Sequence, residues 1–256
     1  MTESAKRICI LGGGFGGLYT ALRLNSLPQN VSEPTEIVLI DQRDRFLFSP
    51  LLYELVTGEL ATWEIAPPYA ELLAGTQIRF VQTSVESADL AAQQVQLGTG
   101  ETLAYDRLVL ALGGETPMDM VSGAAEHAIP FRTVEDAHRL QERLRELETS
   151  EVDKVRVAVI GGGYCGVELA CKVADRLGDR GRVRLVERAD DILLTSAEFN
   201  RKAARDALSE RGIWLDLETS VEAITADTLT LNYREQADEL PVDIVLWTVG
   251  TRVVPL

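Results

Sequence analysis

The chain has 256 residues, and 46% of them are hydrophobic, so it is long and apolar enough for one large domain or two of ordinary size. Its formal net charge of −15 argues against nucleic-acid binding, because neutralising phosphates requires a basic surface. No apolar run approaches the ~20 residues of a membrane span, and the start of the chain is too short for a signal peptide, so we expect a cytoplasmic protein.

The first apolar run, residues 8–11, leads directly into a glycine-rich turn. Gly12, Gly14 and Gly17 form the pattern Gly-x-Gly-x-x-Gly. In dinucleotide-binding domains the first glycine allows a tight turn, the second lets a pyrophosphate approach the backbone, and the third lets a helix pack closely on the strand. The pyrophosphate lies at the helix N-terminus, where free N–H groups and the helix dipole favour an anion. The pattern therefore predicts a strand, a turn and a helix that begin a nucleotide site.

An acidic residue ends the second apolar run, residues 36–40. Asp41 follows Gly17 at roughly the 20-residue offset that is typical of a carboxylate bound to a ribose 2′-hydroxyl. The first half also predicts a helix that begins at Pro50 and ends at Gly58, a short helix over 69–73, a strand over 77–81, a hairpin over 94–103 and a buried strand over 105–112.

The second half repeats this plan. Gly161, Gly163 and Gly166 carry the same pattern after the apolar residues 157–160, and Glu187 ends the next strand at a similar offset. The other elements predicted here are a helix within 130–148, a helix over 199–211, a strand over 213–217, an antiparallel pair over 221–231 and a buried strand over 242–249 that ends at Gly250. Two such glycine patterns with two acid-ended strands predict an α/β fold with two Rossmann-like dinucleotide-binding domains.

Metal and cysteine chemistry have little support in the sequence. Cys9, Cys165 and Cys171 form no Cys-x-x-Cys pair, and His127 and His138 offer no metal-ligand spacing. We therefore expect no metal site and interpret the cysteines as small buried residues.

Several longer segments resemble one flavoprotein family, the type II NAD(P)H dehydrogenases, in particular the cyanobacterial and plastid branch that reduces demethylphylloquinone and related quinones. The segments are FSPLLYEL at residues 48–55, WEIAP at 63–67, GGGYCGVELA at 161–170 and LWTVGT at 246–251. The resemblance covers the chain from about residue 6 onward. It implies an oxidoreductase that passes hydride from NAD(P)H to FAD and then two electrons to a membrane quinone.

The resemblance also implies a discontinuous FAD domain. Residues 1–118 would form its N-terminal part, residues 119–251 the NAD(P)H domain, and residues 252–256 the start of the return to the FAD domain. Family members continue beyond this point, with the rest of the FAD domain, a quinone-site helix and a membrane anchor. The chain thus resembles a C-terminally truncated member, for which we expect weak FAD retention and little quinone turnover. The resemblance implies a quinone as partner and, in the family, association with the periphery of a membrane on its cytoplasmic face, through an anchor that we expect this chain to lack. A homodimer is a further alternative.

Roles follow from the resemblance residue by residue. The residues implied at the FAD site are Gly12, Gly13, Gly14, Phe15, Gly16 and Gly17 around the pyrophosphate, Asp41, Gln42 and Arg43 at the ribose, Ser49, Pro50 and Leu51 near the flavin, Val85 at the adenine, and Ala111, Leu112 and Gly113 along the cofactor. The residues implied at the NAD(P)H site are Gly161, Gly163, Tyr164, Cys165 and Gly166, then Glu187 and Arg188 at the ribose, and Gly250.

Three questions stay open at this point. Glu168 is the catalytic candidate, near the nicotinamide and flavin rings in the family, but it also fits a charge stabilised by the N-terminal dipole of its helix. Glu187 favours NADH, whereas Arg188 could accommodate the 2′-phosphate of NADPH. The rival functions are a nucleotide-binding fragment without turnover and a sulfide or disulfide oxidoreductase of the same superfamily, which would need a redox cysteine pair.

Overall fold

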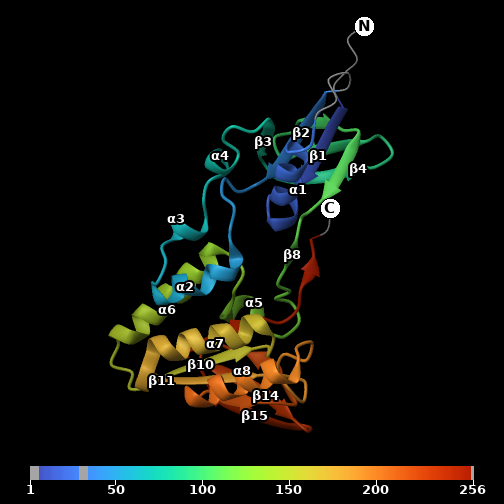
Figure 1. Cartoon of the computed structure of the whole chain (residues 1–256). Coiled ribbons are helices and arrows are strands. Elements are labelled where there is room, and N and C mark those ends of the chain that lie inside the picture. The colour runs from blue at the N-terminus through green and yellow to red at the C-terminus, as the bar shows by residue number, and fades with distance from the viewer. Residues whose placement is uncertain (1–5, 29–33, 255–256) are drawn as a thin grey trace. The chain divides into compact units, whose positions relative to one another are not determined.

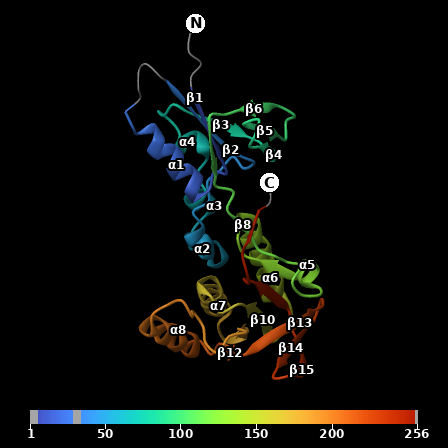
Figure 2. The ribbon, with the colours of Figure 1, turned by 90° about the vertical axis from the view of Figure 1, so that its right-hand side faces the viewer.

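The computed structural model describes residues 6–28 and 34–254, and these residues divide into two compact units (Figures 1 and 2). The first unit contains the described residues up to Phe48, then Trp63–Glu115, and Val253 with Val254. The second unit contains Ser49–Thr62 and Thr116–Arg252. Short elements lie where the chain passes from one unit to the other: α3 (Thr62–Ile65), β8 (Gly114–Glu115) and β17 (Arg252–Val253).

A parallel sheet in the order β3-β2-β1-β7 forms the centre of the first unit. Its strands are β1 (Lys6–Leu11), β2 (Thr35–Asp41), β3 (Ile78–Gln82) and β7 (Arg107–Leu110). The unit also contains the helices α1 (Phe15–Asn25) and α4 (Tyr69–Leu72) and an antiparallel sheet of β4 (Val85–Asp89), β5 (Gln94–Leu97) and β6 (Thr102–Ala104).

The side chains of β1 explain the layers of this unit. Ile10 belongs to the core cluster that contains Leu18 of α1, whereas Cys9 and Leu11 belong to the cluster that contains Val95 of β5. Successive side chains of a strand point to opposite faces, so the parallel sheet separates a helical layer from an antiparallel layer. This is why an uninterrupted apolar run, rather than an alternating one, precedes the first glycine turn.

The second unit has the same plan with a wider sheet, in the order β12-β11-β10-β16-β9. Its strands are β9 (Ala128–Pro130), β10 (Val155–Ile160), β11 (Gly181–Val186), β12 (Trp214–Asp216) and β16 (Ile244–Trp247). The helices are α5 (Ala124–His127), α6 (Val134–Thr149), α7 (Tyr164–Leu177), the 3-10 turn η2 (Gly178–Arg180) and α8 (Glu198–Glu210). The antiparallel layer is β13 (Thr219–Ile224), β14 (Thr228–Tyr233) and β15 (Gln236–Pro241).

The antiparallel layer of the second unit packs against the parallel sheet (Figure 1). Ala158 and Ile160 of β10 share a core cluster with Leu229 and Leu231 of β14. The same cluster contains Trp247, which is 2% exposed and donates its indole N–H to the Pro117 carbonyl at 3.0 Å. The indole is therefore fully satisfied inside the core, as a buried tryptophan requires.

Residues 49–62 differ from the predicted domain boundaries, because they belong to the second unit although they interrupt the first in sequence. They form the 3-10 turn η1 (Ser49–Leu51) and the helix α2 (Leu52–Thr57), which ends at Gly58 with φ +76° as predicted. Side chains of α6 and α7 bind the last carbonyls of α2: Gln141 donates to Leu55 O at 3.0 Å and Arg176 to Val56 O at 2.5 Å. These bonds add partners to carbonyls at the end of the helix, where intrahelical bonding runs out.

Two other predictions need correction. The strand predicted over 105–112 is shorter, and it is not buried throughout, since its last residue, Leu110, is 58% exposed. The reason is that β7 is the edge strand of its sheet. The pair predicted over 221–231 has a third strand, β15, whose residues are mostly exposed and so lack an apolar pattern. Among the described residues, no helix has both the length and the apolar character that crossing a bilayer requires.

Two candidate nucleotide-binding sites

The first glycine of each pattern makes the same turn. Gly12 has φ +97° and Gly161 has φ +109°, a backbone region that L-residues with a side chain rarely adopt. Each turn is tied to the neighbouring strand, because Gly12 N–H donates to Ile40 O and Gly161 N–H to Val186 O, both at 2.8 Å. The two turns therefore leave the ends of β1 and β10 in the same way.

The third glycine of each pattern brings the helix against the turn. A Cβ atom on Gly17 would lie 1.7 Å from Gly12 O, and one on Gly166 would lie 1.8 Å from Gly161 O. Real Cβ atoms do not approach a carbonyl oxygen this closely, so only glycine fits either position. This confirms the packing role predicted for the third glycine.

The second glycine of each pattern faces open space at the start of a helix. Gly14 is the N-cap of α1 and Gly163 the N-cap of α7. Among the described residues, no atom lies within 4 Å of a Cβ built on either glycine, and no side chain caps either helix. The first turns hold no acidic residue. Free N–H groups and the positive end of a helix dipole beside such a space suit an anion.

Asp41 holds the first glycine turn in place. Its carboxylate is buried, with the residue 7% exposed, and accepts the backbone N–H of Gly13 at 2.6 Å and that of Arg43 at 2.8 Å. The predicted contact with a ribose did not include this backbone role. A carboxylate has about four acceptor positions, so both oxygens keep capacity for a ligand.

Glu187 does the same at the second turn. It accepts the backbone N–H of Gly162 at 2.6 Å and that of Ala189 at 2.8 Å. In both sites, then, the acid that ends the second strand binds the backbone N–H of the glycine between the first and second glycines of the pattern. We call this residue, Gly13 in the first site and Gly162 in the second, the middle glycine of the turn. Charge-assisted bonds of this kind are roughly twice as strong as neutral ones.

The carbonyl of each middle glycine is also bound, but by different groups. The Tyr69 hydroxyl donates to Gly13 O at 2.7 Å, and the Leu193 backbone N–H donates to Gly162 O at 2.9 Å. Burial raises the pKa of Tyr69, so its hydroxyl stays a donor. Sequence analysis missed both Tyr69 and Leu193. Neither belongs to a motif, and each lies next to its turn only because the chain folds back on itself.

A pocket lies beside each turn within its own unit. The first has a volume of about 180 Å³ and is lined by Gly12, Ile40, Asp41, Gln42, Arg43, Thr83, Ser84, Val85, Leu112 and Val254. The second has a volume of about 450 Å³ and is lined by Met120, Val121, Ile160, Gly161, Gly163, Val186, Glu187, Arg188, Thr219, Ser220, Val221, Trp247, Thr248, Val249 and Gly250. The structure thus gathers most of the predicted adenosine-side residues of each site around one hollow.

Three hydroxyl residues that follow parallel strands line these pockets and were not predicted. Thr83 and Ser84 follow β3, and Thr248 follows β16. Their position in the sequence could have identified them, because ligands of α/β sheets bind beyond the carboxyl ends of the parallel strands and each of these residues follows such a strand.

Other predicted residues lie around the turns rather than in the pockets. Phe15 and Gly16 begin α1, and Tyr164 and Cys165 begin α7. The Phe15 ring meets Phe46 edge-on, with 5.0 Å between ring centroids. Ala111 follows β7 and also lies against the first turn, since a Cβ on Gly12 would come within 2.3 Å of Ala111 O. Gly113 comes two residues later in the first unit, and Ser49, Pro50 and Leu51 form η1 of the second unit.

Glu168 lies in the second turn of α7, so it is not among the first-turn residues that the helix dipole stabilises most. Partial burial raises the pKa of its carboxyl, a hydrogen bond with Tyr53 opposes the rise, and the nearby Glu54 adds to it. This environment weakens the interpretation of Glu168 as a simple helix-end charge.

Comparison with known proteins agrees with this geometry. The family model of the pyridine nucleotide-disulphide oxidoreductases matches residues 6–255. The chain belongs to the pyridine nucleotide-disulphide oxidoreductase family. Two solved structures share the fold. The NADH complex of NDH2 from Plasmodium falciparum matches with a TM-score of 0.86 at 19% identity. This match covers 98% of this chain and 56% of the NDH2 chain. The sulfide:quinone oxidoreductase of Aquifex aeolicus matches with a TM-score of 0.83 at 25% identity. This match covers 95% of this chain and 58% of the Aquifex chain.

Curated members of the family are similar along the whole chain. It is 57% identical over 261 residues to demethylphylloquinone reductase NdbB of Synechocystis sp., covering 100% of this chain and 64% of that protein. It is 42% identical over 274 residues to the alternative NAD(P)H-ubiquinone oxidoreductase C1, chloroplastic/mitochondrial, of Arabidopsis thaliana, covering 96% and 53%. The chain therefore spans less than two thirds of the length of either relative.

The three cysteines of this family member are free thiols, and all lie within the described residues. Burial raises the pKa of Cys9 to about 11 and also raises the pKa of Cys165 and of Cys171. The reactive form of a cysteine is the thiolate. We therefore expect all three thiols to react with iodoacetamide at pH 8 more slowly in the native protein than in the urea-unfolded protein, and Cys9 by roughly tenfold or more. Mass spectrometry after timed labelling measures this, and rapid native labelling of two cysteines would contradict it.

Proposed function

We propose that the chain binds FAD at the first glycine turn and a nicotinamide dinucleotide at the second, as part of an NAD(P)H:quinone oxidoreductase. The observation that carries this is the repeated turn, with one helix N-terminus, one open second glycine and one acid-ended strand in each unit. The names of the two curated relatives, a demethylphylloquinone reductase and an NAD(P)H-ubiquinone oxidoreductase, support the quinone as electron acceptor.

The residues present fit these cofactors. At Gly14 and Gly163 a side chain would fill the space that a pyrophosphate needs, and glycine leaves it open. The N–H groups at the starts of α1 and α7 would bind the pyrophosphate oxygens. Asp41 and Glu187 would accept ribose hydroxyls with the capacity that their backbone bonds leave free.

When bound, the two cofactors supply hydride donation, hydride acceptance and the two-electron delivery that reduces a quinone. The chain's own residues bind and orient them. Glu168 is the catalytic candidate, since its raised pKa favours a carboxyl that takes up and releases a proton. A membrane quinone would also place the protein at a bilayer surface, so the proposal includes peripheral membrane association.

NADH is the proposed donor. The Glu187 carboxylate would repel the 2′-phosphate of NADPH, and the exposed Arg188 in the same pocket is the residue that could offset this. Tighter binding of NADPH than of NADH would refute this choice.

The experiment is anaerobic reduction of FAD-loaded protein. We expect NADH to bleach the visible flavin absorbance and a short-chain ubiquinone to restore it slowly, in keeping with the little quinone turnover expected of this chain. Protein that binds neither FAD nor NADH would overturn the proposal, and bleaching by sulfide but not by NADH would favour a sulfide oxidoreductase. Binding of both nucleotides without bleaching would indicate a nucleotide-binding fragment without turnover.

Asp41→Ala tests the first site. The variant loses the charge-assisted hydrogen bond that holds Gly13 in the turn and a second one to the Arg43 N–H, each worth ~1.5–3 kcal/mol, so FAD affinity should fall by at least about tenfold. Flavin fluorescence titration measures the dissociation constant. Asp44→Ala is the matched control, because the Asp44 side chain is 62% exposed and pairs with Arg45 rather than with the turn. Equal FAD affinity of wild type and Asp41→Ala would show that this acid is not part of the site.

A further inference from the structure

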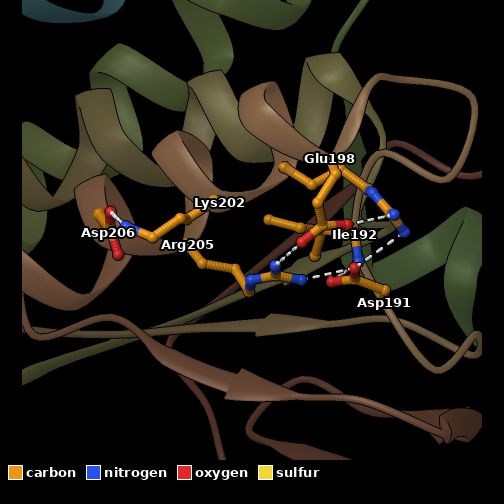
Figure 3. A network of polar contacts seen from close by, with 7 residues as sticks. Asp191, Ile192, Glu198, Lys202, Arg205 and Asp206 are labelled. Atoms are coloured by element: carbon orange, nitrogen blue, oxygen red, sulfur yellow. Dashed lines mark hydrogen bonds and ion pairs between the residues drawn. The ribbon is translucent and has the colours of Figure 1, made fainter.

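The loop between β11 and α8 is anchored by one carboxylate. Asp191 accepts the backbone N–H of Ile192 at 2.9 Å and guanidinium N–H groups of Arg201 at 3.1 Å and Arg205 at 2.5 Å (Figure 3). Its side chain is 13% exposed, and the Arg205 guanidinium holds its pKa below the usual range. Glu198 pairs with the same two arginines and closes the network.

The residues that follow Asp191 reach the second glycine turn. Ile192 is fully buried and packs closely on Gly162. A Cβ atom added to Gly162 would lie only 2.9 Å from the Cγ2 atom of Ile192. Leu193 donates its backbone N–H to Gly162 O at 2.9 Å. The loop therefore binds the carbonyl of Gly162, whereas Glu187 binds the N–H of the same glycine.

Leu193 makes this contact in a strained conformation. Its φ is +50°, in the left-handed region, although it is a leucine and 8% exposed. This region is unfavourable for a residue with a side chain, and such a conformation persists only where neighbouring contacts enforce it. Backbone bonds hold Leu193 on both sides, from its N–H to Gly162 O at 2.9 Å and from the Ser196 N–H to its carbonyl at 2.8 Å, and Asp191 anchors the chain two residues before it.

We propose that Asp191 is a positioning residue of the second nucleotide site, acting through Leu193 on the peptide of Gly162. This inference rests on the proposed function, in which the turn around Gly162 holds a nicotinamide dinucleotide. It is specific to that site, because at the first turn the corresponding carbonyl, Gly13 O, is bound by the Tyr69 hydroxyl instead. Loss of the anchor should therefore weaken the nicotinamide nucleotide and leave the flavin unaffected.

Asp191→Asn tests this, with Asp206→Asn as the matched control. Asp206 lies on the same helix as Arg205 and pairs with Lys202 at 2.8 Å, but both partners are exposed and neither bonds to the loop (Figure 3). We expect NADH to bind about tenfold more weakly to Asp191→Asn, with an unchanged dissociation constant for Asp206→Asn and unchanged FAD binding in both. Arg205→Gln, which removes one donor, should weaken NADH by a smaller factor.

A second substitution separates positioning from general stability. Leu193→Gly keeps the N–H donor and removes the penalty for a positive φ. In the Asp191→Asn background it should therefore tighten NADH binding by about threefold or more, although it removes a buried side chain and should lower the melting temperature. NADH affinity that is equal in wild type and Asp191→Asn, or that Leu193→Gly fails to improve, would overturn the inference alone. Wild-type protein that binds no NADH would overturn the proposed function, and this inference with it.

Discussion

A Gly166→Ala variant is expected to lose about 3 kcal/mol or more of the folding free energy of the second unit. The added Cβ would lie 1.8 Å from Gly161 O and 3.0 Å from the Thr248 hydroxyl oxygen. The Gly161 peptide cannot move away cheaply, because its N–H is bonded to Val186 O at 2.8 Å and its φ of +109° is already special to glycine. Alanine gains at most about 1 kcal/mol of helix propensity over glycine, so the clash dominates.

Urea unfolding followed by tryptophan fluorescence measures this loss. Trp247 is buried in the core of the second unit, whereas Trp63 of the first unit is 71% exposed, so the change in signal on unfolding should come mainly from the second unit. Gly163→Ala in the same unit is the mild comparison, because no described atom lies within 4 Å of its added Cβ. A Gly166→Ala variant with wild-type stability would show that the turn and α7 can separate without loss.

A Gly163→Ala variant is expected to fold normally and to bind NADH about a hundredfold more weakly. The backbone at Gly163 is extended, with φ −75°, and no described atom lies within 4 Å of the added Cβ. The stability cost should be below about 1 kcal/mol, that of alanine at an N-cap. The same methyl group would occupy the space proposed for the pyrophosphate. The pyrophosphate would then lose at least one charge-assisted hydrogen bond to the N–H groups at the start of α7, worth ~1.5–3 kcal/mol.

Fluorescence titration with NADH and a urea unfolding curve on the same sample distinguish the two effects. Gly14→Ala is the reciprocal variant, and it should weaken FAD while leaving NADH unchanged, because Gly14 occupies the matching position in the first unit. If Gly163→Ala binds NADH as tightly as the wild type, the pyrophosphate does not approach this glycine, and the assignment of the second site fails.

The sequence by itself determined the elements whose cause is local. Uninterrupted apolar runs before Gly12 and Gly161 indicated strands buried on both faces, and the spacing of three glycines required a turn that opens a helix. The carboxylates at Asp41 and Glu187 were predictable for the same reason, since a strand of known length brings its last residue to the turn beside it. The duplication of this plan predicted two α/β units of one design.

Tertiary structure alone decided which distant groups complete each turn. Tyr69 and Leu193 serve the same carbonyl position in the two sites, yet they come from a short helix in one unit and a loop in the other. Residues 49–62 join the second unit because side chains of α6 and α7 bind the end of α2, and no local pattern in those residues records this. The same holds for Asp191, whose partners are 10 and 14 residues away. Such contacts depend on how separate elements pack together, and packing is not encoded in the periodicity of any one element.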